Sequence, residues 1–171
     1  MDSITGLKGA LRCNIARAGE RFYFTSKGGY FYSVAAPEKS GGDWLLDDGS
    51  LRAVALENGG DAAHPAMSTC TPVVYNGRAY IGVSGTGQFT PYSGHNITVI
   101  DLTGWKIAYS VPTQGYPQTS GLLTTAYGAE DGTVYVYFFD NYTPGKLRVL
   151  KDAPGQTRAM LTTEESYTVK G

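Results

Sequence analysis

The side chains of this chain that are best suited to chemistry are two cysteines, Cys13 and Cys70, and two histidines, His64 and His95. Thiolates and imidazoles hold zinc when several of them stand at short, regular spacings, and these four do not. His64 precedes a proline in a linker, which favours a solvent-exposed polar residue over a catalytic one. The sequence also lacks the Gly-x-Ser-x-Gly motif that presents a nucleophilic serine. We therefore predict no catalytic residue and no metal ligand.

One local concentration of carboxylates needs a separate interpretation. Its members are Asp43, Asp47, Asp48 and Asp61. Carboxylate oxygens are the ligands that calcium prefers, but the ligand order of an EF-hand loop is absent. A solvated acidic loop is the favoured interpretation, and residues 37–49 are also the least strand-like part of their region.

Aromatic side chains in or beside loops form a third group. They are Phe89, Tyr92, Tyr116 and Tyr142. Aromatic rings offer flat apolar faces, and tyrosine adds a hydroxyl, so such rings suit both protein and carbohydrate partners. These four are the predicted ligand-facing residues. The alternative is that most of the tyrosines pack inside the fold.

The elements that carry these residues are β-strands. Residues 71–111 contain four short runs rich in Val, Ile and Tyr, separated by Asn76-Gly77, a Gly/Ser/Pro stretch and Thr103-Gly104. Runs of this composition, bounded by such turns, are typical of antiparallel strands joined in succession. Four strands make one small twisted sheet, which needs neighbouring sheets to bury both of its faces.

The neighbouring sheets are predicted by an internal repeat. Tyr80 follows Tyr23 at the same interval at which Cys70 follows Cys13, and Tyr135 follows Tyr80 at nearly that interval. A period in the fifties with four strands per unit predicts the blades of a β-propeller. We expect an all-β chain whose blades cover about 12–57, 70–111 and 119–165. A β-sandwich with similar hairpins is the alternative.

The repeat places Cys13 and Cys70 at equivalent positions in adjacent blades. A disulfide needs Cα atoms within about 7 Å and converging Cβ vectors, and strands of different blades are often farther apart. Free cysteine is among the most buried residue types. We therefore predict two buried, unpaired thiols over a disulfide.

The composition excludes several classes of function. The chain of 171 residues carries 14 basic and 15 acidic residues, which gives no electrostatic reason to bind nucleic acid or an anionic membrane. No apolar run is long enough to span a bilayer, and none follows Met1 as in a signal peptide. Three blades fall short of the roughly four to eight that close a propeller. We therefore expect a piece of a longer protein or a unit that another chain completes, with open blade edges that favour self-association.

The run V-I-D-L-T-G-W-K-I-A-Y resembles the repeat of the pyrroloquinoline-quinone-like β-propellers, with Asp101, Thr103, Gly104 and Tyr109 at the matching places. The first blade carries a degraded version that ends at Trp44. In such repeats this aromatic ring docks between neighbouring blades. The resemblance therefore implies that Trp44 and Tyr109 are blade-docking residues.

The stretches from Gly115 to Tyr127 and from Tyr135 to Leu150 are similar to propeller regions in uncharacterised surface or secreted proteins of gut Firmicutes. This resemblance implies a non-catalytic scaffold or adhesion module outside the cell or on its surface, with no cofactor and a protein or carbohydrate partner. The alternative is a fragment of a propeller enzyme, either a quinoprotein-type oxidoreductase or a carbohydrate-active enzyme.

Overall fold

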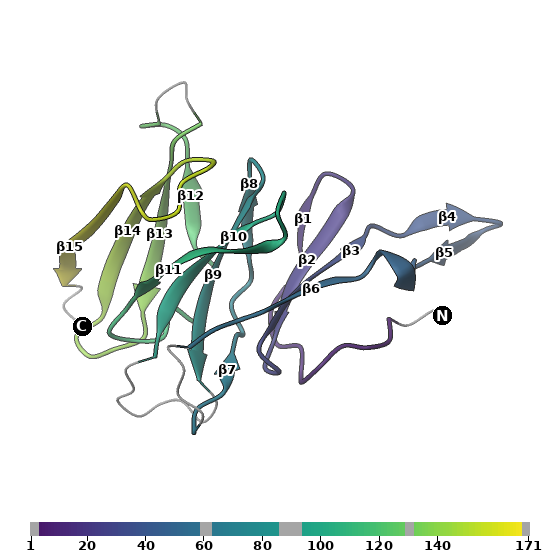
Figure 1. The fold of residues 1–171 in the computed structure, drawn as a ribbon, viewed down its shortest axis with the longest axis horizontal. Helices are drawn as coiled ribbons and strands as arrows, with labels where there is room; N and C mark the ends of the chain where they lie inside the picture. Colours follow the sequence, from purple (N-terminus) through teal and green to yellow (C-terminus); the bar gives the residue numbers. More distant parts are fainter. Residues whose placement is uncertain (1–3, 59–62, 86–93, 129–131, 169–171) are drawn as a thin grey trace.

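The structure is a computed structural model that describes residues 4–58, 63–85, 94–128 and 132–168, with the side chains of Trp44 and of residues 161–168 outside the description. It contains three antiparallel sheets that follow one another along the chain and stand side by side (Figure 1). Among the described residues, the one helical segment is a single short 3₁₀ turn. No helix in these ranges has both the length and the apolar composition needed to cross a bilayer.

Sheet one has the strand order β1-β2-β3-β6. Its strands are β1 (Ala16–Ala18), β2 (Arg21–Ser26), β3 (Tyr30–Ala35) and β6 (Arg52–Ala55). The turn from β2 to β3 ends at Gly29, whose φ of 81° is accessible to glycine without steric cost.

A small hairpin leaves sheet one between β3 and β6 and projects away from the three sheets (Figure 1). It pairs β4 (Glu38–Ser40) with β5 (Asp43–Leu45) through Gly41 and Gly42, both at positive φ. The 3₁₀ turn η1 (Asp48–Ser50) follows, and the Asp47 side chain accepts a hydrogen bond from the amide of Gly49. The part of the chain that looked least like a strand is therefore a hairpin, because two adjacent glycines allow a tight reversal.

Sheet two is the central sheet. It contains β7 (Ala66–Met67), β8 (Val73–Tyr75), β9 (Arg78–Gly85), β10 (Asn96–Asp101) and β11 (Lys106–Pro112). The turn between β8 and β9 is Asn76-Gly77, with both residues at positive φ as a two-residue hairpin turn requires. Every residue of β9 is buried, because the sheet is covered on both faces.

Sheet three has the order β12-β13-β14-β15. Its strands are β12 (Leu122–Thr124), β13 (Val134–Asp140), β14 (Lys146–Asp152) and β15 (Leu161–Thr168). Burial alternates along β13: Val134, Val136 and Phe138 are buried, whereas the residues between them are more exposed. One face of this sheet therefore packs on sheet two and the other does not.

The larger of two apolar core clusters among the described residues joins the three sheets. It includes Phe31 and Val54 from sheet one, Ile81 from sheet two, and Val136 and Leu150 from sheet three. The short strands β1 and β8 of adjacent sheets lie side by side. The predicted all-β fold, with about three antiparallel blades of a propeller, is confirmed, and the arrangement is not that of a two-sheet sandwich.

Candidate functional site

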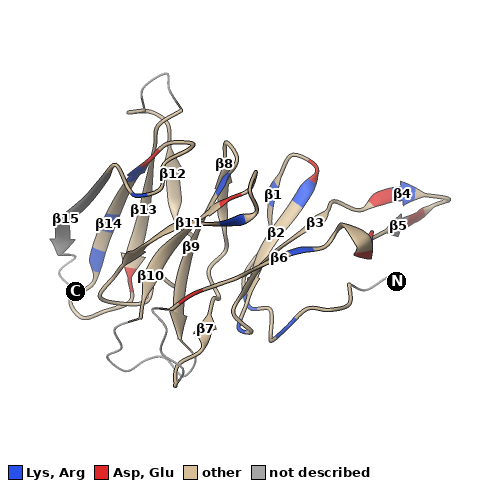
Figure 2. Cartoon of the chain, viewed as in Figure 1, with Lys and Arg blue, Asp and Glu red and all other residues tan. Residues whose placement is uncertain are grey.

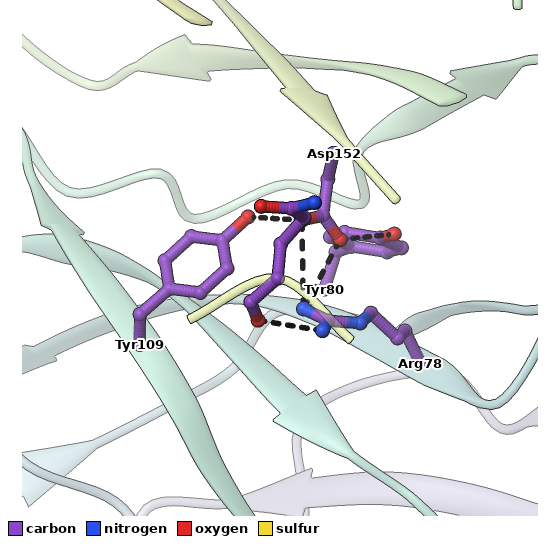
Figure 3. Close-up of polar contacts among 5 residues, drawn as sticks. Arg78, Tyr80, Tyr109 and Asp152 are labelled. Carbon is purple, nitrogen blue, oxygen red and sulfur yellow. Dashed lines mark hydrogen bonds and ion pairs between the residues drawn. The ribbon is translucent and has the colours of Figure 1, made fainter. Parts of the chain in front are cut away.

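A buried ion pair joins sheet two to sheet three. Arg78 begins β9 and Asp152 ends β14, and their side chains are only 4% and 0% exposed. Nη1 of Arg78 lies 3.3 Å from one carboxylate oxygen of Asp152 and 3.4 Å from the other. Nη2 of Arg78 donates to the backbone carbonyl of Gln156 at 2.6 Å. The guanidinium is therefore held by groups of the third sheet and the segment that follows β14 (Figure 3).

Two tyrosines of sheet two converge on the same carboxylate (Figure 3). The Tyr80 hydroxyl donates to Oδ2 of Asp152 at 2.9 Å, and the Tyr109 hydroxyl donates to Oδ1 at 2.7 Å. Burial, reinforced by the adjacent negative charge of Asp152, raises the pKa of both hydroxyls far above their ordinary value. Both tyrosines therefore remain neutral donors at physiological pH, and Asp152 accepts hydrogen bonds from three side chains.

We refer to Arg78, Tyr80, Tyr109 and Asp152 as the polar junction. A buried charge is tolerated only when it is paired and hydrogen-bonded, and this carboxylate meets both conditions. Its donors are directed at Asp152 and not at open solvent. The arrangement is therefore suited to joining two sheets, whereas general acid–base chemistry needs a group within reach of a substrate.

A polar cleft of about 490 Å³ opens beside the polar junction. Its walls include Arg78, Asp101, Lys106 and Gln156. Among the residues that the structure describes, no three or more histidine, cysteine, aspartate or glutamate side chains gather as a metal site would require. A ligand of this cleft would meet three charged side chains, those of Arg78, Lys106 and Asp101.

The two predicted blade-docking residues lie in different surroundings. Tyr109, on β11, is partly buried and reaches sheet three through its bond to Asp152. Trp44 lies in β5 of the projecting hairpin, and its side chain is outside the described part. The docking role of Trp44 therefore stays a prediction.

The aromatic ring that joins sheets one and two is Trp105, which the sequence interpretation overlooked. Its ring lies 5.6 Å from that of Phe31, measured between centroids, and its Nε1 donates to the carbonyl of Ala53 at 3.2 Å. The guanidinium of Arg52 lies over the same ring. The available signal was a tryptophan directly after the Thr103-Gly104 turn, next to the repeat motif that drew attention to Tyr109 instead.

The four predicted ligand-facing aromatic residues differ in what the structure shows of them. Phe89 and Tyr92 lie outside the described residues. Tyr142, in the connection after β13, is exposed and stays a prediction. Tyr116 is a correction, because it is only 3% exposed. Its hydroxyl accepts a hydrogen bond from the amide of Thr69 at 2.6 Å, so the ring is fixed between the sheets by a polar anchor that the sequence did not reveal.

The two cysteines are unpaired, as predicted. Cys70 is fully buried, and burial raises the pKa of its thiol to about 12, which keeps it protonated and unreactive. Cys13 is only half-buried, contrary to the prediction, because it lies on the side of sheet one that no other sheet covers.

His95 is buried beside the connection between β9 and β10. Its Nδ1 lies 2.7 Å from the Ser84 hydroxyl, and its ring stacks on that of Tyr116. Burial lowers the pKa of the imidazole, so the ring is neutral at physiological pH. Ser84 is fully buried as well, which suits a structural bond across the base of this connection better than a nucleophile that must reach a substrate.

Comparison with known proteins identifies the fold. No protein-family model matches the chain, and no curated protein matches its sequence. In structure, the chain is similar to a quinohemoprotein alcohol dehydrogenase from Pseudomonas putida HK5, with 15% sequence identity and a TM-score of 0.53. The match covers 92% of this chain and 27% of that chain. At this identity the likeness concerns the fold alone, and it agrees with the three sheets being blades of a partial β-propeller.

Proposed function

We propose that this chain is a propeller segment that acts as a non-catalytic scaffold and presents loops to a protein or carbohydrate partner. The observation that carries the proposal is the polar junction. The two charged groups of the polar junction, Arg78 and Asp152, are buried and are bonded to each other and to neighbouring groups across two sheets. The chain thus uses these groups to hold its sheets together.

The proposed binding surface lies at one end of the sheets. Tyr142 is in the connection from β13 to β14, and it is 38% exposed. Phe89 and Tyr92 belong to the connection from β9 to β10, the equivalent strands of sheet two. The two connections leave equivalent ends of adjacent blades. Phe89 and Tyr92 lie outside the described residues, and we assign them to this surface from their place in the sequence alone.

The proposed compartment is the outside of a bacterial cell, either secreted or on the surface. Support for it comes from the sequence resemblance to surface and secreted propeller proteins. The fold likeness to a quinohemoprotein alcohol dehydrogenase favours neither a scaffold nor an oxidoreductase, because one propeller fold hosts many functions.

A glycan-binding experiment tests the proposal. The chain is applied to an array of immobilised bacterial, plant and animal glycans, followed by the variants Tyr142→Ala and Phe89→Ala with Tyr92→Ala. Loss of a stacking ring should weaken binding roughly tenfold. Tyr127→Ala is the matched control, because Tyr127 is an exposed ring in the connection from β12 to β13, at the opposite end.

Unchanged binding by the variants at the Tyr142 end would contradict the proposed surface. Alcohol-dependent reduction of a dye by the chain, supplied with pyrroloquinoline quinone and calcium, would contradict the non-catalytic role and favour the oxidoreductase instead.

A further inference from the structure

The face of sheet one that points away from sheet two is apolar and hollowed, and the N-terminal segment packs on part of it, so that Phe24 and Val34 are only 5% and 1% exposed. A cavity of about 530 Å³ opens over it, and its walls include Leu11, Ile15, Phe22, Phe24 and Val34. Leu11 and Ile15 are 47% and 63% exposed. We call this surface the open face of sheet one. Exposed apolar surface of this kind marks an interaction site in a soluble protein.

The internal repeat shows what kind of surface covers such a face. Ala79 and Ile81 flank Tyr80 on β9 as Phe22 and Phe24 flank Tyr23 on β2, so the two pairs hold equivalent places. Side chains alternate along a strand, so Ala79 and Ile81 point away from the side on which Tyr80 meets sheet three. They therefore face sheet one, and both are completely buried in the shared core. The equivalent face of sheet two is thus covered by the preceding four-stranded sheet.

Sheet three leaves the complementary face uncovered. Tyr135 of β13 is the repeat equivalent of Tyr80, and Tyr137 and Phe139 share its side of the strand. Leu122 pairs with Tyr137 and so lies on this side too. Leu122 is 68% exposed and Phe139 is 53% exposed. We call this surface the open face of sheet three. In sheet two the equivalent face, which carries Tyr80, is covered by the next sheet.

The polar junction has charged residues at two positions, those of Arg78 and Asp152. The equivalent positions on the two open faces hold uncharged residues. Asp152 pairs with Val134 in sheet three, and Val34 pairs with Phe22 at the equivalent place in sheet one. The place of Arg78 is taken in sheet three by Thr133, which precedes Tyr135 as Arg78 precedes Tyr80. If the open face of sheet three meets the open face of sheet one, the places equivalent to Arg78 and Asp152 hold no charge.

Charges of both signs lie at the open face of sheet one, where the ammonium group of Lys8 lies over the ring of Tyr30. The ammonium group of Lys151, on β14, lies over the ring of Tyr135 on the open face of sheet three. Exposed Asp47 and Asp48 lie next to Leu46, which lines the cavity of sheet one. Figure 2 shows basic residues along β14, acidic residues on η1, and residues of both charges on the β4–β5 hairpin. Opposite charges at the rim of an interface select the partner and its orientation.

We propose that the open face of sheet one binds the open face of sheet three of a second copy of this chain. The contact is head-to-tail, so each copy offers one face and receives the other. Two copies joined twice in this way close a ring of six sheets, which lies within the roughly four to eight blades of closed propellers. A head-to-tail contact that closes after a rotation gives a finite ring and not a fibre.

The first test is the mass of the purified chain in solution. Sedimentation equilibrium at high micromolar concentration should give about twice the 18.3 kDa of one chain. A monomer over the whole concentration range would overturn the proposal. It would mean that something other than a second copy, such as a neighbouring blade of a longer protein, covers these faces. Larger, open-ended assemblies would also overturn it, because they would mean that the ring does not close.

The second test separates a head-to-tail contact from a symmetric one. The variants Ile15→Glu and Phe139→Glu each place a charge on one exposed position of one open face, so each should sediment as a monomer. In an equimolar mixture, the unmodified open face of sheet three in the first variant meets the unmodified open face of sheet one in the second. The mixture should therefore regain the dimer mass.

Three outcomes of the second test would overturn the proposal. They are a mixture that stays monomeric, a single variant that stays dimeric, and loss of the dimer in the control Tyr127→Glu. The control adds the same charge at an exposed ring on neither open face. Far-UV circular dichroism of each variant checks that the sheets are folded. We expect them to fold, because the substituted side chains are exposed.

Discussion

The junction between sheets one and two and the junction between sheets two and three are built from opposite kinds of side chain. The first relies on rings: Phe31 packs on Trp105, and Trp105 also bonds to a backbone carbonyl of sheet one. The second is the polar junction, in which Arg78 and two tyrosines share Asp152. Apolar contacts tolerate many partners of similar volume, whereas a buried charge tolerates only a partner that neutralises it. The comparison suggests that the first junction mainly supplies stability and the second mainly determines which sheet may follow sheet two.

The largest expected effect comes from removing the shared carboxylate. Asp152→Ala leaves the buried Arg78 charge unpaired and two tyrosine hydroxyls without their acceptor, which should cost about 3–5 kcal/mol in the free energy of unfolding. Urea denaturation measures it. The double variant Arg78→Met with Asp152→Leu is the control and should recover much of the loss. A cost below about 1 kcal/mol for Asp152→Ala would refute the assigned role of the carboxylate.

Alkaline pH should weaken the polar junction next. The folded chain holds Tyr80 and Tyr109 protonated above pH 10, where tyrosines of the unfolded chain ionise. The stability from these raised pKa values is complete below pH 10 and declines as the pH rises, by about 1.4 kcal/mol per pH unit for each tyrosine. Urea denaturation from pH 8 to about pH 11 measures the slope. Tyr80→Phe with Tyr109→Phe should flatten it, and an equal slope in this variant would contradict the prediction.

A conservative change in the apolar junction should have a smaller effect. Phe31→Leu keeps an apolar side chain at a fully buried position, so we expect a loss of roughly 1.5 kcal/mol, mostly from the reduced volume. Thermal and urea unfolding give the value. A loss as large as that of Asp152→Ala would show that both junctions are equally selective and would remove the contrast between them.

The smallest expected effect is that of one hydroxyl. Tyr109→Phe removes one of three side-chain donors to Asp152 and leaves the ring in place, so it should cost about 1 kcal/mol. Tyr75→Phe is the control, because Tyr75 is an exposed tyrosine at the end of β8. If Tyr109→Phe lowers the free energy of unfolding no more than the control does, the Tyr109 hydroxyl adds nothing to the stability that the ion pair supplies.

Much of the fold could be predicted because local sequence determines it. Asn76-Gly77 marks a hairpin turn by its conformational preference, and the recurrence of Tyr23, Tyr80 and Tyr135 marks equivalent strands. Each of these signals lies within a short stretch or recurs at a nearly constant interval.

The polar junction could not be predicted, because neither a local turn preference nor the internal repeat indicates which residues form it. Asp152 lies far along the chain from Arg78, and the places equivalent to Asp152 hold Val34 in sheet one and Ile100 in sheet two. An internal repeat reveals the residues that its copies share, whereas Asp152 is present in the third copy alone. The burial of Tyr116 was missed for a related reason, since its anchor on Thr69 comes from another part of the chain.

Trp105 couples the unfolding of two repeats. It has a φ of 51°, in the left-handed region that a bulky residue enters only at a cost of about 1–2 kcal/mol. Contacts with Phe31, Arg52 and Ala53, all from sheet one, hold the ring there. If sheet one detaches, the turn between β10 and β11 loses the contacts that offset this cost. Repeat arrays often unfold one unit at a time when their interfaces are weak. Here the turn of one repeat depends on its neighbour, so sheets one and two should melt in a single cooperative transition.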